Sequence, residues 1–418
     1  MLVYHFGAMK VNFPLKARRC LAIVSLLAAA GSMEVKGQGT TQLWTGIVPP
    51  PENGTAYSLS DIQGGIWDDT ANWADAAAGV VTNYHSLTTG AGRVASFQPK
   101  TGGYTVTIAD DYTVPIIRAL QASGGNNSWV MIQANVDKTI RLSVQSGAYL
   151  SVGANKELII GENVAIDLFG TGVYTLSKLG DGTVRWSGAV ATPFTHTLRI
   201  DAGRFIIDAD ASSRLNSSST VVVNGGEFRY NGAAALEATV TLNSGRISGE
   251  GRIASAVTVG ANATVAPGDG KVGAQKYDSL TFASGGTYQW EIGSWNGTSA
   301  GIDFDQLQAT AFSVTATDES RFVISIATYG GALPDFDGSQ NRSWTILDSE
   351  ETIPAGVLEK LALDDTAFRA VHAFDGDFSL EIRDGDLTLV YTTIPEPRLV
   401  LWAGAALAAF ATRRRGNR

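Results

Sequence analysis

Residues 142–161 read LSVQSGAYLSVGANKELIIG, and this stretch decides the fold. It contains a short alternating run of apolar residues, a small turn and a second alternating run. Similar units return about every 20 residues. They read LRIDAGRFIID at 198–208, VVVNGGEFRYNG at 221–232, VTLNSGRISGEGRIAS at 240–255 and VTVGANATVAPG at 257–268. A unit this short cannot bury its own apolar side, so neighbouring units must stack, and we expect a parallel β-helix.

The composition of the chain favours an all-β fold. The 418 residues include 47 glycines against 12 prolines and four methionines, and Gly-Gly, Asn-Gly and Ser-Gly pairs separate the short runs. No long stretch between residues 40 and 390 has the 3.6-residue period of an amphipathic helix. We expect a right-handed parallel β-helix over 111–301, a tryptophan-containing N-terminal cap over 44–110 and an antiparallel β module over 302–392. In that module, Asp384-Gly385 predicts a hairpin turn.

The first residues follow the order of a secretory signal peptide. Basic residues between 10 and 19 precede an apolar run over 20–30, and small residues follow. We assign 1–37 to this signal, whose removal would take away Cys20, the single cysteine of the chain. The exported body would then contain no disulfide and would depend on burial and backbone pairing for its stability.

Residues 394–418 combine a short polar motif, an apolar run and a basic cluster. The motif is Pro395-Glu396-Pro397, the apolar run covers 399–411, and the cluster is Arg413, Arg414 and Arg415. As a helix, the run would be roughly 20 Å long at about 1.5 Å per residue, barely enough for a bilayer. The arginines favour a cytoplasmic C-terminus. This arrangement predicts a hydrophobic helix that stops transiently in the membrane, with an ordinary single-pass tail anchor as the alternative.

This tail resembles the PEP-CTERM sorting signal of Gram-negative bacteria, whose motif is matched by Pro395, Glu396 and Pro397. The resemblance implies recognition by an exosortase, a membrane protease-transpeptidase with a Cys nucleophile. It also implies cleavage near the motif. The protein would then be held in the inner membrane transiently before it reaches the cell surface or the extracellular matrix.

Two segments of the repeat region resemble the autotransporter-associated β-strand repeat. They are YTLSKLGDGTVRWSG at 174–188 and HTLRIDAGRFII at 196–207. The matching residues surround two turns and are Lys178, Gly180, Gly182, Thr183, Ser187, Gly188 and Gly203. The loop ATPFTHT at 191–197 departs from the family pattern. The resemblance implies a passenger-like β-helix and supplies no catalytic residues. Because no outer-membrane barrel pattern follows, it does not imply self-translocation.

Three tryptophans are candidates for stacking on sugars, because aromatic faces can pack against carbohydrate rings. Trp67 and Trp73 lie in the segment WDDTANW, and Trp186 lies in the repeats. The alternative for the first two is a plug that closes the open end of the β-helix and shields its core and strand edges. We favour the plug over a sugar site.

Motifs for metal binding or catalysis are nearly absent from the sequence. In DFDGSQN, the residues Asp335, Asp337 and Asn341 place oxygen ligands at alternate positions, but the closing Glu of an EF-hand is missing. This segment is therefore a weak calcium candidate, and solvated turn acids are the preferred interpretation. The histidines lack metal-ligand spacing, and there is no Cys nucleophile, Gly-x-Ser-x-Gly elbow or phosphate loop.

A polysaccharide lyase or hydrolase on a β-helix would need clustered acids or bases on one outer face of several coils. The repeats offer one tight acidic group, and its members follow strands as turn residues would: Asp201, Asp208 and Asp210. An enzyme is therefore the least favoured of the three functions that we considered.

The charge of the body limits its partners. Ten of the 31 Lys and Arg residues lie in 1–37 and 398–418, against one of the 40 Asp and Glu residues, which leaves the body with a net charge of about −18. Such a body is not expected to bind nucleic acid. The sequence predicts an exported, non-enzymatic surface or matrix protein without a cofactor. Its expected partners are the exosortase, the membrane before cleavage and an exopolysaccharide, and a surface glycan-binding protein is the alternative.

Overall fold

The structure is a computed structural model that describes residues 41–44, 65–66, 73–77, 80–84, 94–97, 100–108, 111–114, 116–119, 128–143, 148–170 and 172–394. The expected signal peptide, Trp67, the Pro-Glu-Pro motif and the arginine cluster lie outside these residues. Within the described residues, no helix is long and apolar enough to cross a membrane.

Most of the strands belong to one sheet with 21 strands in the described residues. These strands are β1 (Thr41–Trp44), β2 (Gly65–Ile66), β3 (Trp73–Ala77), β4 (Val80–Tyr84), β5 (Val94–Phe97), β6 (Lys100–Thr101), β7 (Tyr104–Ile108), β9 (Ile116–Ala119), β10 (Ser128–Ala134), β12 (Ala148–Val152), β13 (Lys156–Ile160), β15 (Thr175–Leu179), β16 (Thr183–Trp186), β17 (Thr197–Ile200), β18 (Arg204–Ile207), β19 (Thr220–Tyr230), β20 (Thr239–Gly249), β22 (Ala263–Pro267), β24 (Thr287–Ile292), β26 (Phe322–Thr328) and β28 (Leu361–Asp364).

Two smaller sheets and three short helical segments complete the described fold. The second sheet contains β8 (Tyr112–Val114), β11 (Lys138–Ser143) and β14 (Val164–Phe169). The third contains β21 (Ile253–Val259), β23 (Ala274–Phe282), β25 (Gln306–Val314), β27 (Arg342–Ser349), β29 (Asp377–Arg383) and β30 (Asp386–Thr392). The helical segments are the 3₁₀ turns η4 (Ala209–Arg214) and η5 (Ala355–Lys360) and the α-helix α2 (Thr366–Arg369).

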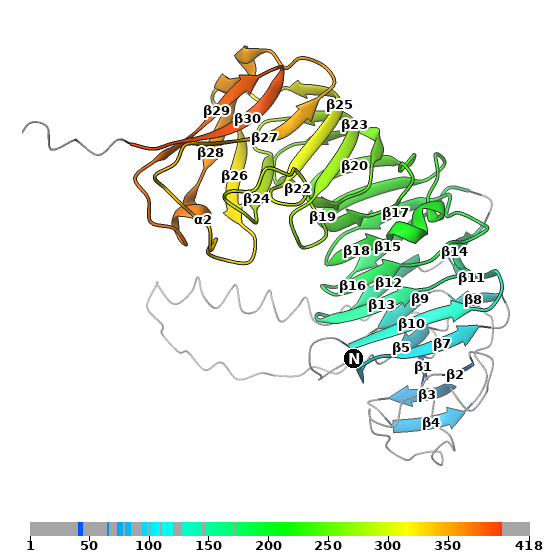
Figure 1. The fold of residues 1–418 in the computed structure, drawn as a ribbon. Helices are drawn as coiled ribbons and strands as arrows, with labels where there is room; N and C mark the ends of the chain where they lie inside the picture. The colour runs from blue at the N-terminus through cyan, green and yellow to red at the C-terminus, as the bar shows by residue number, and fades with distance from the viewer. Residues whose placement is uncertain are drawn as a thin grey trace, which may run out of the picture. The chain divides into compact units, whose positions relative to one another are not determined.

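Parallel pairing lays successive coils side by side (Figure 1). Leu158 pairs with Val184, Val184 with Phe205 and Phe205 with Phe228, and all four side chains are fully buried. Because side chains alternate across a strand, the neighbouring positions form a second column on the outer face. The alternation seen in the sequence therefore produces an apolar interior and a polar exterior. The fold is mostly β with parallel strands, and it resembles a β-helix as expected.

A second parallel ladder runs through β9, β12, β15 and β17 to β19. The long strand β19 joins both ladders, because its residues 220–223 pair with β17 and its residues 227–230 pair with β18. Two strands of one coil therefore align with a single strand of the next. The β16–β18 and β18–β19 steps also position the side chains of the candidate site described below.

The parallel stack continues past residue 302, which corrects the prediction of an antiparallel module over 302–392. β25 pairs in parallel with β23 and β27, and β26 pairs in parallel with β24 and β28. Within 302–392, antiparallel pairing is restricted to β27 with β30 and β29 with β30. The later coils contain long connecting loops, so their spacing no longer shows the short repeat. The predicted hairpin turn is confirmed, since Asp384 and Gly385 both have positive φ, at 54° and 100°, as a type I′ turn requires.

Two buried basic side chains fasten the turns of the stack. Lys178, which matches the repeat pattern, is fully buried, and its Nζ donates to the carbonyls of Gly180 at 2.6 Å and Ala202 at 2.9 Å. Arg214, which is 2% exposed, donates from Nε to Gly188 O at 2.9 Å and from Nη1 to Val164 O at 2.7 Å. Its Nη2 donates to two further carbonyls of the same turns. Each cation satisfies carbonyls from different coils that would otherwise lack donors.

Candidate functional site

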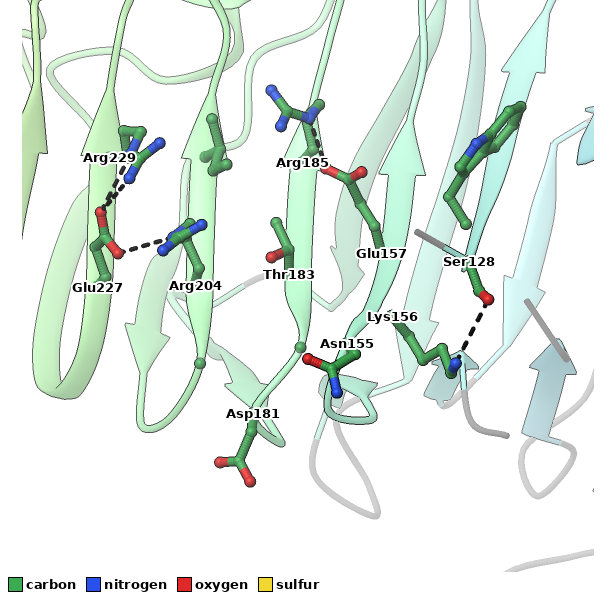
Figure 2. Close-up of a pocket in the computed structure, with 14 residues that line it drawn as sticks. Ser128, Asn155, Lys156, Glu157, Asp181, Thr183, Arg185, Arg204, Glu227 and Arg229 are labelled. Atoms are coloured by element: carbon green, nitrogen blue, oxygen red, sulfur yellow. Dashed lines mark hydrogen bonds and ion pairs between the residues drawn. The ribbon is translucent and has the colours of Figure 1, made fainter. Parts of the chain in front are cut away.

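A depression of about 710 Å³ crosses the outer face of β10, β13, β16, β18 and β19. It is lined mainly by polar and charged side chains, and Figure 2 shows Glu157, Thr183, Arg204 and Glu227 following one another along the coils. We call this depression the outer groove.

Strand register explains why residues far apart in sequence meet in the outer groove. Trp129 pairs with Glu157, Glu157 with Thr183, Thr183 with Arg204 and Arg204 with Glu227. These residues occupy the outward positions beside the buried column, and neighbouring strands lie about 4.8 Å apart. The groove is therefore a row of five adjacent side chains, each contributed by a different coil.

At the edge of this row, Arg185 on β16 links β13 to Asp208, the residue that follows β18. Its Nε donates to Glu157 Oε1 at 2.7 Å, and its Nη1 donates to Asp208 Oδ1 at 2.7 Å. Burial acts to lower the pKa of Arg185, but the hydrogen bond and charge of Glu157 and the charge of Asp208 raise it overall. The guanidinium therefore stays charged and holds both carboxylates in place.

Glu227 is the most strongly held acid of the outer groove. It accepts hydrogen bonds from Arg204 Nε at 2.8 Å, Arg229 Nη2 at 2.8 Å and Ser248 Oγ at 2.6 Å. Although burial opposes ionisation, these hydrogen bonds and charges lower the pKa of Glu227 to about 2. A carboxylate with so low a pKa does not supply a proton near neutral pH, so Glu227 is unsuited to act as a general acid.

The structure contradicts the proposal that Trp186 stacks on a sugar. Its side chain is 1% exposed and packs edge-on against Phe205 and Phe194, with ring centroids 4.9 and 5.7 Å apart. Trp186 shares the inward side of β16 with Val184, so strand alternation places both in the core. Trp73 lies on β3, but its side chain and the whole of Trp67 lie outside the description, so their role remains a prediction.

The three residues of the weak calcium candidate accept hydrogen bonds from the protein itself. Asp335 accepts from Ser294 Oγ at 2.8 Å and from two backbone N–H groups of the same loop. Asp337 accepts from the backbone and side chains of the residues that follow it. Asn341 Oδ1 accepts from Thr393 N at 2.9 Å. These oxygens fix loops rather than converge on a cation, and the described residues contain no acidic, His or Cys cluster suited to a metal.

The acidic group of the repeat region also has structural partners. Asp208 pairs with Arg185, Asp201 pairs with Arg199 at 2.9 Å, and Asp210 accepts from Gly188 N at 3.0 Å. Each acid therefore fixes a strand end or a turn, in keeping with the prediction that these acids are turn residues.

His196 has both ring nitrogens occupied. Its Nε2 lies 3.1 Å from Asp167 Oδ1, and its Nδ1 accepts from Tyr174 N at 3.4 Å. These partners assign the proton to Nε2 in the neutral ring. Because neither nitrogen is free to take a proton from a nucleophile, we assign His196 a structural role at the turn.

The outer groove was not predicted from the sequence, although the sequence contains a signal for it. Aligning the repeats on their turn glycines places Gly203-Arg204, Gly226-Glu227 and Gly245-Arg246 at equivalent positions. Alternating charges in one column of stacked coils predict ion pairs between neighbouring coils. The repeat length varies from coil to coil, so a fixed spacing hides this column.

Comparison of the chain with protein-family models, with curated proteins and with solved structures gave no match in any of the three searches.

Proposed function

We propose that this protein is an exported, non-enzymatic component of the cell surface or extracellular matrix, built as a right-handed parallel β-helix. An exosortase would recognise the tail at 394–418 and cut near Pro395-Glu396-Pro397. The membrane would hold the chain only until that cut, and an exopolysaccharide would be its neighbour afterwards.

The observation that carries this proposal is that the packed body ends just before the Pro-Glu-Pro motif. The last strand, β30, ends at Thr392, and Thr393, whose N–H and Oγ1 both donate to Asn341 Oδ1, ties the chain to the body just before the motif. Cleavage at Pro395-Glu396-Pro397 would therefore leave every strand and every packed side chain of the described stack in place.

The edge strand β29 also suits a protein that must not pair with neighbouring chains in a crowded surface layer. β29 pairs only with β30 among the described strands, and its exposed positions include Asp377, Glu381 and Arg383. Charged side chains on an edge strand disfavour pairing with another chain. The edge of the third sheet is thereby protected from pairing with another chain while the tail is processed.

The chemistry of the outer groove supports a non-enzymatic function. Two of the three carboxylates that line the groove, Glu157 and Glu227, are each paired with an arginine, and Glu227 has a pKa of about 2. The third, Asp181, lies in the turn that precedes β16. A hydrolase of the usual kind needs an acid with a raised pKa beside a second carboxylate. The outer groove instead has the fixed ion pairs of a recognition surface.

The test is intact-mass and C-terminal peptide analysis of the protein recovered from surface and medium fractions. The wild-type chain is expected to end near Pro397, and the double variant P395A/E396A is expected to retain Arg418. A matched control replaces an exposed acid and an exposed proline of the folded body, Glu351→Ala with Pro354→Ala, and should be processed normally. A wild-type chain that retains Arg418 would overturn the proposal and leave an ordinary tail anchor.

A further inference from the structure

A half-buried tryptophan lies at one end of the outer groove. Trp129 lines the groove from β10, and its indole ring lies so close over Gly103 that no side chain fits at that position. The glycine lets the ring cover the backbone of the neighbouring coil. Aromatic rings held in this way provide flat apolar surfaces, which suit the apolar face of a sugar ring.

A row of hydrogen-bonding groups continues from this ring along the stack. Glu157, Thr183, Arg204 and Glu227 occupy the next four strands, so the row extends about 19 Å from Trp129 at about 4.8 Å per strand. Figure 2 shows Thr183 between Glu157 and Arg204 on the same face. Donors and acceptors thus alternate at a spacing close to the length of one hexose unit in an extended chain.

The charge balance of the groove selects among possible ligands. Arg185 pairs with Glu157 and Asp208, Arg204 pairs with Glu227, and Arg229 pairs with Glu227 and Asp269. Every arginine that lines the groove therefore already has a carboxylate partner. The remaining cation of the lining, Lys156, is 5% exposed and donates from Nζ to Ser128 Oγ at 3.4 Å. A polyuronate or another polyanion would therefore find little accessible, uncompensated positive charge and would meet acidic side chains. An uncharged chain of hydroxyl groups meets no such penalty.

We infer that the outer groove binds an extended neutral polysaccharide, with one hexose stacked on Trp129 and the following units along Glu157, Thr183 and Arg204. The side chains of Arg204 and Arg185 are 44% and 30% exposed, so they can donate to sugar hydroxyls while they keep their carboxylate partners. Arg229, whose side chain is 9% exposed, is buried behind Glu227 and holds its carboxylate in position. This inference goes beyond delivery to the surface and does not depend on how the tail is processed.

The test is isothermal titration of the purified full chain with cellohexaose, laminarihexaose and maltohexaose, and with hexagalacturonate as the polyanionic probe. At least one neutral hexasaccharide is expected to bind, more tightly than hexagalacturonate. W129A should weaken this binding roughly tenfold, as loss of a stacking surface does. The matched control is Y149A, which removes an outward aromatic ring of β12 that does not line the groove, and should keep the affinity within about twofold of wild type.

A second variant guards against a fold defect in W129A. Thr183→Trp fills the middle of the groove from an outward position and leaves the buried column unchanged, so it should abolish binding while the thermal unfolding curve stays close to that of wild type. The inference is overturned if no neutral hexasaccharide binds, if hexagalacturonate binds most tightly, or if folded W129A and T183W both bind as wild type does. None of these outcomes depends on cleavage at the Pro-Glu-Pro motif.

Discussion

The outer groove and the turns of the stack hold their basic side chains in different ways. In the groove, Arg185 and Arg204 remain partly exposed and pair with carboxylates of neighbouring coils. In the turns, Lys178 and Arg214 are almost fully buried and donate to backbone carbonyls. An exposed ion pair can exchange part of its hydration for a ligand at little cost. A buried carbonyl that loses its donor has no replacement.

This difference teaches that charge alone does not identify a functional face in a stacked β fold. The groove cations are available for recognition, whereas the turn cations act as fasteners. The two sets should therefore respond differently to substitution and to pH, and the following predictions test that separation.

The largest effect is expected for Arg214→Met, because the variant leaves the carbonyls of Gly161, Val164, Ser187 and Gly188 without their donor. At about 1–3 kcal/mol for each buried unsatisfied group, partly relieved by water, the free energy of unfolding should fall by about 3–5 kcal/mol. Urea denaturation followed by far-UV circular dichroism measures this change.

The matched control for this prediction is Arg199→Met, since among the described residues Arg199 pairs with Asp201 alone and its side chain is 44% exposed. It should change stability by no more than about 0.5 kcal/mol. If both variants lost the same free energy of unfolding, the hydrogen bonds from Arg214 to the turn carbonyls would contribute no more to stability than an exposed ion pair does.

A smaller effect, of about 2 kcal/mol at pH 7, is expected for Lys178→Met, which removes hydrogen bonds to three backbone carbonyls. Burial lowers the pKa of Lys178 from 10.5 to about 8. Between these values the unfolded chain binds more protons than the folded one, so this group makes stability rise with pH. The gap between wild type and Lys178→Met should therefore widen between pH 8 and 10 in the same urea experiment. A constant gap would contradict the lowered pKa.

The smallest effect, of about 1–2 kcal/mol at pH 7, is expected for Glu227→Gln, which weakens the charge pairing of Arg204 and Arg229. Hydrogen bonds and arginine charges keep the folded pKa of Glu227 at about 2, below its unfolded value, so its contribution is present above pH 4.5 and is lost as the pH falls towards 2. The gap to wild type should close over this acidic range.

The control for the acidic range is Glu381→Gln, because Glu381 is a half-exposed acid paired with Arg383 on β29. It should change stability by less than about 0.5 kcal/mol at any pH in this range. If the two glutamate variants behaved alike, the groove network would have no more structural weight than a surface ion pair.

Much of the fold could be predicted from alternation and turn residues alone. The alternation in TVRW and in RFII predicts two strands, which the structure has as β16 and β18. The same alternation could have placed Trp186 in the core beside Val184. The hairpin turn at Asp384-Gly385 was predictable because only a few residue pairs tolerate positive φ at both positions.

The features that could not be predicted depend on which strands pair and in what register, and the sequence does not contain this information directly. Parallel pairing of β24 with β26 joins strands that are separated in the chain by β25 and two loops, so the later coils could not be found by a fixed repeat length. The outer groove requires the register of five strands at once, and one wrong offset would separate Arg204 from Glu227. The buried role of Arg214 depends on carbonyls of turns far away in the sequence, which carry no residue-specific signal, and Lys178 likewise donates to Ala202 of the next coil.

The pairing of each coil with only its two neighbours also has a genetic consequence. Arg204 is in register with Glu227, so an in-frame loss of residues 204–226 would remove one coil and preserve the alternation of every strand that follows. It would also remove Arg214, and with it the donor to carbonyls of the coils that remain. Insertion of a single codon within a strand would instead turn its apolar side outward. The length of this stack, and with it the length of the outer groove, can therefore change in steps of whole coils only where the buried cations that fasten the turns are kept.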